Sequence, residues 1–354
     1  MTDHTPYIQL LQQLIQTQSY SGEENQTADI IAQFMTDKGI EIYRDNNNVW
    51  AFNKFHTAVK PYVLLNSHHD TVKPNKGYTR DPFEASIENN TLYGLGSNDA
   101  GGCLVSLLAL FIHFYEKENL NYNLIFAATA EEENSGPNGI RSVIPQLPEI
   151  NFAVVGEPTQ MNLAIAEKGL MVIDGTATGV SGHAAHENTV NAIYKALEDI
   201  AWIKDYQFEK VSAILGKVKM NVTQINAGTQ HNVVPAECHF VIDVRVNEHY
   251  SNQEIFDTLQ VNTQSELKAR SFRHSSSSIP LEHPIVQAGI ALGRSTYGSP
   301  TLSDQAALTC PSLKLGPGDS TRSHQADEYI LVSEIEEGIE LYIQLFCSLL
   351  YNQI

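Results

Sequence analysis

Three short, continuously apolar segments of this chain each lead into residues that can bind a metal ion or move a proton. They are Tyr62–Asn66 before Ser-His-His-Asp, Asn123–Ala128 before the glutamates at 131–133, and Phe152–Gly156 before Glu157. Apolar strands without polar alternation are typical of a sheet whose two faces are both covered. In an open α/β sheet, ligands gather beyond the carboxyl ends of the strands. The sequence therefore predicts an α/β sheet in which one edge carries the side chains that can bind a metal ion or move a proton.

Helical patterns alternate with these strands in the first part of the chain. Apolar residues at helical spacing predict helices at Pro6–Thr17, at Glu23–Lys38, which Ser21-Gly-Glu-Glu opens, and at Gly101–Tyr115. Short strands are expected near Ile40–Tyr43 and Val49–Asn53. Strand–helix alternation of this kind is the pattern of an α/β domain.

A different pattern interrupts the chain between about Ile165 and Arg273. It has a strand–helix–strand–strand–helix–strand order, which is that of a ferredoxin-like α+β insert. The expected elements are a strand at 170–177, a helix at 189–202, strands at 217–225 and 238–246, a helix at 252–258 and a strand at 267–272. Ser275–Ser278 is interpreted as a linker, and helices at 284–293 and 333–350 resume the first pattern. We therefore predict a larger domain of residues 1–164 and 277–354, interrupted by a smaller domain of residues 165–276.

Charge and composition exclude several classes of function. The chain has 22 Lys and Arg against 41 Asp and Glu, a formal charge of −19, and phosphate backbones require a basic surface instead. The longest apolar run, Cys103–His113, is shorter than the roughly 18 residues of a membrane span and predicts a buried helix. The N-terminus lacks a secretory pattern, and four widely separated cysteines suggest a reduced compartment. We expect a cytoplasmic protein with no nucleic-acid or membrane partner.

The adjacent histidines in "NSHHDTV" differ in the direction of their side chains. Successive residues of a strand point to opposite faces, so His68 and Asp70 share a face while His69 points away from it. A carboxylate on the second ring nitrogen of a metal-binding histidine fixes its tautomer and raises its basicity. His68 is therefore the predicted ligand, with Asp70 as its partner.

Imidazole and carboxylate groups recur at strand and loop ends. They are His68, Asp99, the glutamates at 131–133, Glu157 and His324. Such ligands without thiolates suit Zn²⁺, Co²⁺ or Mn²⁺. Neighbouring glutamates diverge in direction, so one of Glu132 and Glu133 can bind metal while the other polarises a water molecule. The Gly-rich "GLGSNDAGG" lacks the GxGxxG spacing of a nucleotide site.

The ordered set of motifs resembles the M20 family of metallo-aminoacylases and exopeptidases, in particular its acetylornithine deacetylase and succinyl-diaminopimelate desuccinylase branch. The motifs are "SHHDTV", "YGLGSNDAGG", "ATAEEENSG", "VGEPT", "GVSGHAAHE", "QHNVVPAEC" and "GPGDSTRSHQADEY". The resemblance implies a zinc-exopeptidase-like catalytic domain and an α+β lid and dimerisation domain. It also implies two divalent metal ions, Zn²⁺ or Co²⁺.

Carried onto this chain, the resemblance implies a role for each site residue. One metal ion would be held by His68, Asp99 and Glu157, and the other by Asp99, Glu133 and His324, with Asp99 bridging. Glu132 would be the general base and then the general acid, and Asp70 the partner of His68. Three consecutive glutamates permit another register, but anchoring on Thr129-Ala130 favours Glu132 and Glu133 over Glu131.

The resemblance also implies roles for three residues of the insert. His183 would stabilise the oxyanion of the transition state, in many relatives from across a dimer interface, and His186 competes for this role. Asn232 and Arg245 would hold the polar backbone and the α-carboxylate of the substrate. An arginine suits a carboxylate because its planar donors form a fork.

Together these expectations describe an amidohydrolase that acts on a small N-acyl amino acid. N-acetylornithine or N-succinylornithine, in arginine biosynthesis, is the expected substrate, and a succinyl carboxylate would need a further cation such as Arg322 or Lys168. Citrulline, lysine or diaminopimelate derivatives, or a di- or tripeptide, are alternatives within the family. A catalytically dead binding protein and a nucleotide-binding oxidoreductase are alternatives from other classes.

Overall fold

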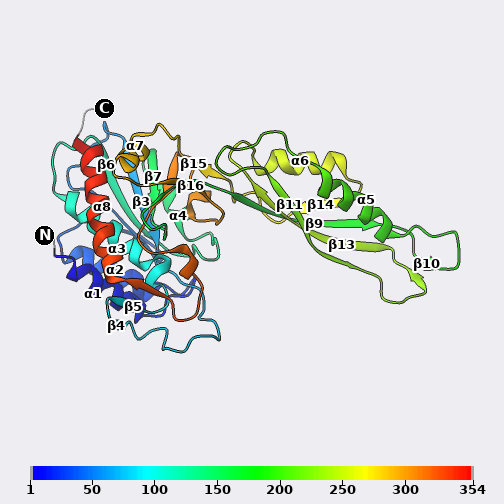
Figure 1. The fold of residues 1–354 in the computed structure, drawn as a ribbon, viewed down its shortest axis with the longest axis horizontal. Coiled ribbons are helices and arrows are strands. Elements are labelled where there is room, and N and C mark those ends of the chain that lie inside the picture. Colours follow the sequence, from blue (N-terminus) through cyan, green and yellow to red (C-terminus); the bar gives the residue numbers. More distant parts are fainter. Residues whose placement is uncertain (1–2, 352–354) are drawn as a thin grey trace. The chain divides into compact units, whose positions relative to one another are not determined.

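The computed structural model describes residues 3–351, and the chain separates into two compact units (Figure 1). The first contains residues 1–165, 278–297 and 303–354, and the second contains residues 166–277 and 298–302. The chain therefore leaves the first unit, builds the second and returns. The short segment Gly298–Leu302, which the sequence did not indicate, also belongs to the second unit.

The main sheet is mixed, with a parallel centre. Its order is β1 (Tyr43–Asp45), β2 (Asn48–Phe52), β6 (Asn123–Thr129), β3 (Tyr62–His68), β7 (Ile150–Val155), β17 (Ser312–Lys314), β8 (Leu163–Glu167) and β15 (Ser277–Ser278), and β16 (Thr296–Ser299) also pairs with β8. The four central strands β6, β3, β7 and β17 are parallel to one another, whereas β2 and β8 pair with the outer two in the antiparallel direction. All four therefore end at the same edge of the sheet.

Alternation along the central strands supplies two hydrophobic cores. Val63 and Leu65 of β3 enter one core, whereas Tyr62 and Leu64 enter the other, as expected for side chains that alternate between faces. The first core is covered by α1 (Thr5–Ile15), α2 (Asn25–Thr36), α3 (Gly102–Tyr115), α7 (Pro284–Ala291) and α8 (Val332–Tyr351). The second is covered by α4 (Ile140–Val143), η2 (Ile144–Gln146) and the segment after η3 (Asp304–Ala307).

Helix α3 is the apolar helix that the sequence predicted to be buried. The helical stretch Ser97–Tyr115 is long and apolar enough to cross a membrane by length and composition, but 83% of its apolar window is buried inside the protein. Its leucines and phenylalanines belong to the first core. The helix is therefore accounted for as a core helix of the first unit.

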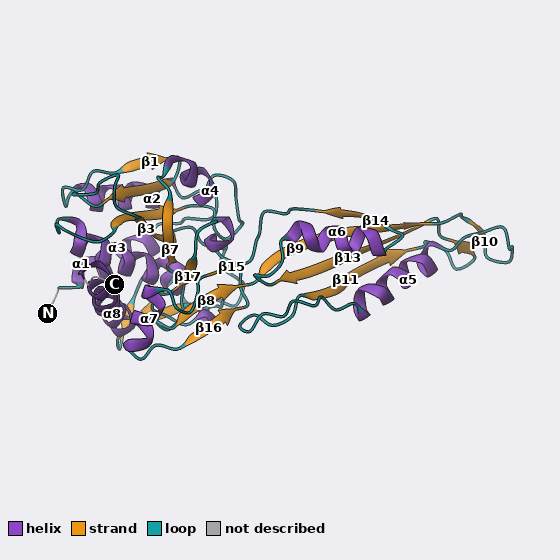
Figure 2. Cartoon of the chain, turned by 90° about the horizontal axis from the view of Figure 1, so that it is seen from above, coloured by secondary structure: helices purple, strands orange, loops and turns teal. Residues whose placement is uncertain are grey.

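The second unit confirms the predicted ferredoxin-like arrangement. Its antiparallel sheet has the order β11 (Lys219–Ala227), β13 (Glu237–Val246), β9 (Gly169–Thr178) and β14 (Glu266–Ala269). Helices α5 (Ala192–Asp205) and α6 (Asn252–Asn262) pack together on one face of this sheet (Figure 2). Ser251 and Glu254 form a capping box at the start of α6, which satisfies backbone N–H groups that the helix leaves free.

Two local expectations were wrong, and a third differed only in where its helix begins. The strand predicted at Ile40–Tyr43 starts only at Tyr43. The chain is still leaving α2 before that point, because Gly39 has a left-handed backbone (φ 73°) and the Ile40 N–H donates a hydrogen bond to the Met35 carbonyl oxygen near the end of this helix. The linker contains β15, which pairs with β8. The second helix begins at Asn25, and the side chain of Glu24 at its N-cap makes no capping hydrogen bond.

Two small sheets escaped sequence analysis because their strands have two or three residues. In the first unit, β4 (Ile87–Glu88), β5 (Thr91–Tyr93) and β18 (Tyr329–Leu331) form a three-stranded sheet. In the second unit, β10 (Gly182–His183) pairs with β12 (Val233–Val234). The latter pair carries one of the predicted catalytic residues, His183.

Candidate metal centre

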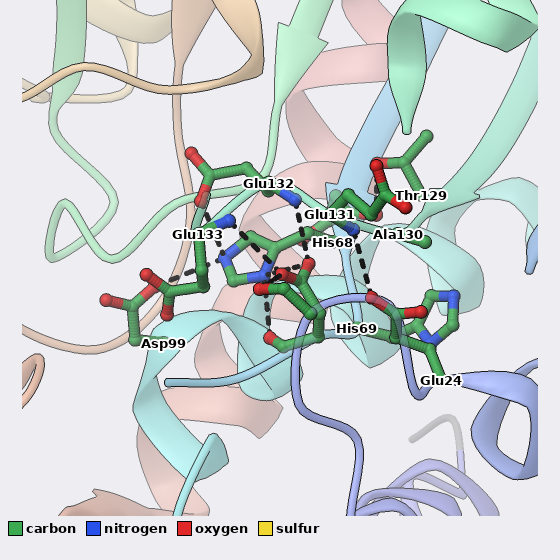
Figure 3. Close-up of polar contacts among 12 residues, drawn as sticks. Glu24, His68, His69, Asp99, Thr129, Ala130, Glu131, Glu132 and Glu133 are labelled. Atoms are coloured by element: carbon green, nitrogen blue, oxygen red, sulfur yellow. Dashed lines mark hydrogen bonds and ion pairs between the residues drawn. The ribbon is translucent and has the colours of Figure 1, made fainter. Parts of the chain in front are cut away.

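The candidate site lies where the parallel strands of the main sheet end. Strand β3 ends at His68, β6 leads to Glu132 and Glu133, and β7 leads to Glu157. Because these strands run in one direction, the residues that follow them meet at one edge. Figure 3 shows His68, Asp99, Glu132 and Glu133 grouped at this edge.

His68 connects three of the predicted residues. It is buried, and its Nε2 lies 3.3 Å from Asp99 Oδ1 and 3.9 Å from Glu132 Oε2. Its Nδ1 lies 2.9 Å from the backbone carbonyl of Asp70 and 3.4 Å from that residue's carboxylate. An N–H on Nδ1 directed at these oxygens leaves the lone pair of Nε2 for a metal ion.

The carboxylate of Asp70 also organises the glutamate turn. It accepts hydrogen bonds from the backbone N–H groups of Glu132 at 3.0 Å and Glu133 at 3.1 Å, and from the Ser21 hydroxyl at 2.7 Å. Burial by itself raises the pKa of Asp70, but contact with His68 and these hydrogen bonds outweigh it, so the pKa lies below its usual value. The Asp70 carboxylate is therefore charged, and it contacts both His68 and the backbone of the turn that contains Glu132 and Glu133.

His324 brings a second imidazole to the other side of Asp99. Its Nε2 lies 2.9 Å from Glu133 Oε2 and 3.7 Å from Asp99 Oδ2. The hydrogen bond to Glu133 raises the pKa of His324 to about 9, despite partial burial. Asp99 thus lies between two histidines, with a different carboxylate oxygen nearest to each.

The carboxylates of the site are crowded. Burial, with the nearby charges of Glu157 and Asp304, raises the pKa of Glu132 well above its usual value, although His68 opposes this. Burial and Asp99 raise the pKa of Glu157 to about 8. Such crowding is what bound divalent cations relieve.

The positions of the ligand atoms fit a metal ion. His68, Asp99 and Glu133 offer atoms that all lie within 4.8 Å of one another, and so do His68, Glu132 and Glu157. Imidazole nitrogens and carboxylate oxygens are the donors that Zn²⁺ and Co²⁺ accept. The residues present therefore suit divalent cations at this edge.

A buried carboxylate that the sequence did not indicate fixes the loop of Asp99. Glu328 accepts backbone N–H bonds from Gly96 at 3.1 Å and from Asn98 and Asp99 at 2.9 Å each. Burial and the charge of Asp99 raise the pKa of Glu328 to about 8, although these hydrogen bonds oppose the shift. Several N–H groups of the Gly-rich segment are thus directed at a carboxylate of the chain itself.

Asp304 is a further carboxylate behind the site that sequence analysis missed. It accepts hydrogen bonds from the Asn66 amide and the Thr129 hydroxyl, both at 2.8 Å. These partners belong to β3 and β6, so Asp304 ties together the ends of the strands that present His68 and the glutamate turn.

Comparison with known proteins identifies the family of the chain. Residues 64–348 match peptidase family M20/M25/M40. The chain belongs to this family. The fold of a dinuclear metal-binding M20 peptidase from Bacillus subtilis superimposes with a TM-score of 0.73 over 97% of both chains, at 15% identity.

Two curated relatives of this M20 chain are similar over nearly their whole length. The acetylornithine deacetylase of Proteus mirabilis is 28% identical over 96% of this chain and 97% of its own. The succinyl-diaminopimelate desuccinylase 2 of a Ruegeria species is 24% identical over 93% of this chain and 91% of its own. The family places the chain among hydrolases, whereas these names describe the relatives.

His69, the other histidine of the motif, lies in a separate polar cluster of the M20 protein. Its Nδ1 is 2.9 Å from the Thr27 hydroxyl, and its Nε2 is 2.9 Å from the Asn47 carbonyl oxygen. Burial lowers the pKa of His69 to about 4, so the ring is neutral. Its hydrogen bonds lead toward α2 and the loop before β2.

The structure brings together two of the three residues predicted in the insert. His183 lies on β10, and Asn232 precedes β12; the Asn232 carbonyl accepts the Ala184 N–H at 2.9 Å. Arg245 lies eight residues beyond the start of β13 at 237, or about 26 Å along the strand. Its guanidinium donates to both carboxylate oxygens of Asp243, at 2.9 and 3.1 Å.

The cations considered for a succinyl group have partners. Arg322 donates to both carboxylate oxygens of Glu334, at 2.7 and 3.1 Å, and lies over the ring of Tyr329. Lys168 belongs to the second unit, where its Nζ lies 3.5 Å from the Lys217 carbonyl oxygen. Lys314, at the end of β17, is buried and opposes the rise in the pKa of Glu157. Lys314 is thus a cation near the site that the sequence did not indicate.

Proposed function

We propose that this M20 protein is a metal-dependent amidohydrolase that removes the acyl group of an N-acyl amino acid. The observation that carries the proposal is the convergence of two imidazoles with carboxylates at one sheet edge. The proposed substrate is N-acetylornithine or N-succinylornithine, as in arginine biosynthesis. The similarity to an acetylornithine deacetylase over nearly the whole chain supports this choice.

We assign two divalent ions, Zn²⁺ or Co²⁺, to this site. His68, Asp99 and Glu157 would hold one and Asp99, Glu133 and His324 the other, with Asp99 shared. The position of Asp99 between the two histidines supports a shared ligand. When bound, such ions polarise an amide carbonyl and make a water molecule acidic enough to act as a nucleophile. The dinuclear site named for the Bacillus subtilis relative supports the number of ions.

Glu132 is the proposed general base and then general acid. Its carboxylate would take a proton from the attacking water and return it to the leaving amine nitrogen, a role that suits a carboxylate of raised pKa. Asp70 holds the Glu132 N–H and keeps His68 in one tautomer. The chain's own part of the reaction is thus positioning and proton transfer.

The second unit would complete the substrate site within a homodimer. We assign His183 to the oxyanion, Asn232 to the polar backbone of the substrate and Arg245 to its α-carboxylate. His183 and Asn232 are exposed and lie near one another, which leaves them available to a second copy of the chain. The exposed edge strand β11, together with Tyr194 and Leu197 on α5, supports an interface there.

Of the two proposed acyl groups, acetyl is the first candidate. An acetyl group needs no cation at the acyl end, whereas a succinyl carboxylate would call for one. Desuccinylation is the second candidate, which the similarity to desuccinylases favours. Because the four cysteines are free thiols, we also propose a cytoplasmic location.

A substrate panel tests the function. The chain is stripped of metal, reloaded with Zn²⁺ or Co²⁺ and assayed on N-acetylornithine, N-succinylornithine, N-succinyl-diaminopimelate and dipeptides. We expect N-acetylornithine to have the highest kcat/KM. Preference for a dipeptide would replace the deacylase proposal with a peptidase, and absence of turnover on every compound would favour a binding protein.

A further inference from the structure

A fully buried carboxylate lies outside the ligand set, at the start of α2. Glu24 has no exposed surface, although glutamates are rarely buried without specific partners. It occupies the N-cap position, but its side chain does not cap its own helix. Its carboxylate is therefore directed at other segments of the chain.

The partners of Glu24 are three N–H donors. One oxygen accepts hydrogen bonds from the backbone N–H of Gly22 and, at 3.2 Å, from that of Glu131. The other accepts a hydrogen bond of 2.7 Å from the Asn47 side chain. Figure 3 shows the Glu24 carboxylate aimed at the backbone of Glu131, which is 107 residues away in the sequence.

The bond to Glu131 completes a pattern along the glutamate turn. The N–H groups of three successive residues, Glu131, Glu132 and Glu133, each donate to a buried carboxylate. The first donates to Glu24 and the next two to Asp70. Glu131 has a left-handed backbone (φ 55°), a conformation that a residue with a side chain keeps only when its surroundings enforce it.

The segment around Glu24 also reaches Asp70. The Ser21 hydroxyl donates to Asp70 at 2.7 Å, and the backbone N–H of Thr71 donates to the Ser19 carbonyl at 2.8 Å. The residues before α2 therefore contact both carboxylates that hold the turn. A contact with Asn47 alone would serve to anchor α2, whereas the bond to Glu131 acts on the turn that carries Glu132.

We infer that Glu24 is a positioning residue for catalysis: it fixes the backbone of the 131–133 turn, and through it the direction of the Glu132 carboxylate. The inference rests on the proposed function, in which Glu132 transfers the proton. Misplacement of a reacting group by about 1 Å can reduce the rate by about 100-fold. Loss of the Glu24 carboxylate removes one of the three hydrogen bonds that hold the backbone N–H groups of residues 131–133. It would shift the Glu132 carboxylate without removing any group of the metal site.

Three variants of the metal-loaded enzyme test the inference. Glu24→Ala removes the acceptor, whereas Glu24→Gln keeps one amide oxygen that can still accept the Glu131 N–H. Glu23→Ala is the matched control, because Glu23 is the exposed neighbour on the same segment. We expect kcat on N-acetylornithine to fall about 100-fold in Glu24→Ala and about tenfold in Glu24→Gln. KM and metal content should stay within twofold of the wild type, and Glu23→Ala should match it throughout.

Hydrogen exchange of the metal-free protein provides a readout that needs no activity. We expect peptides covering residues 131–136 to exchange faster in both Glu24 variants than in the wild type, and at the wild-type rate in Glu23→Ala. If Glu24→Ala does not fold, Glu24→Gln decides the question. Unchanged kcat, or unchanged exchange at 131–136, would overturn the inference. A wild type that cleaves no amide would instead overturn the proposed function, and the exchange comparison would still test the anchor.

Discussion

The two units hold their candidate residues in different ways. In the first unit the side chains are mostly buried, and their backbones are fastened by carboxylates: Asp70 and Glu24 hold the glutamate turn, and Glu328 holds the loop of Asp99. In the second unit His183 and Asn232 lie exposed at the short two-stranded sheet of β10 and β12, while Arg245 lies near the far end of the ten-residue strand β13. The candidate side chains of the first unit are therefore held in place by the protein itself, whereas those of the second unit lie in separate places.

Strand direction explains this difference. Parallel strands bring their carboxyl ends to one edge, so residues far apart in sequence meet. An antiparallel sheet sends successive strand ends to opposite edges, which separates Arg245 from the small sheet of β10 and β12. Loss of a metal ligand or of the base in the first unit should therefore have the largest effect on the rate, and substitutions of the candidate residues in the second unit should have smaller effects.

The largest contrast is expected between the adjacent histidines. His68→Ala should lose about one metal ion per chain and reduce kcat by more than about 10⁴-fold, because the base and the metal site act together. His69→Ala should keep both ions, and should lower the free energy of unfolding by about 1–3 kcal/mol, since Thr27 and Asn47 lose a buried partner. Elemental analysis and chemical denaturation measure these effects. Loss of metal in His69→Ala would show that the wrong histidine was assigned.

Next in size is the loss of the base. Glu132→Ala should reduce kcat by about 10³-fold with metal content retained. Glu131→Ala is the matched control in the same turn, because the Glu131 carboxylate accepts hydrogen bonds from Asn138 and not from the site. Its kcat should fall by less than about tenfold. A larger loss of kcat in Glu131→Ala than in Glu132→Ala would show that the base is Glu131 and that the glutamates were assigned one residue too late.

The sequence indicated those parts of the site that depend on local pattern. An apolar run followed by a polar residue was enough to place His68 and Glu157 at the sheet edge. Local pattern could not indicate Glu24, Glu328 or Asp304, because their hydrogen-bond partners lie far away in the sequence. The separations are 107 residues for Glu24, up to 232 for Glu328 and up to 238 for Asp304. Each of them is an ordinary acidic residue until the fold buries it.

Ser21-Gly-Glu-Glu shows why local pattern can mislead. A serine followed by glutamates resembles a helix start, yet the Ser21 hydroxyl donates to Asp70 and the Glu24 carboxylate accepts from Glu131. The local signal was real, because α2 begins at the next residue, Asn25. The side chains were nevertheless drawn to buried donors and acceptors elsewhere, where an unmet hydrogen bond has a larger free-energy penalty than at an exposed helix end.

An intermediate effect is expected for His183, which tests whether the exposed sheet of β10 and β12 acts together with a second copy of the chain. His183→Ala should keep both metal ions and lower kcat about 100-fold, as the loss of one oxyanion donor does. His186→Ala, in the same loop, is the control and should retain most activity. Mixing His183→Ala with Glu132→Ala subunits should restore part of the activity if each dimer then contains one complete site. No recovery in a verified mixed dimer would mean that His183 does not act across the interface.

The smallest effect should come from Arg245, where the paired donors of the planar guanidinium matter more than its charge. Arg245→Lys should raise KM about tenfold with kcat little changed, equivalent to about 1.4 kcal/mol, because an ammonium cannot form paired bonds to an α-carboxylate. Arg270→Lys is the matched control, since Arg270 donates in the same way to both carboxylate oxygens of Asp174 in the same sheet. If both variants change KM equally, Arg245 acts through the stability of the sheet. A change confined to Arg245 would show that its guanidinium contributes to substrate binding.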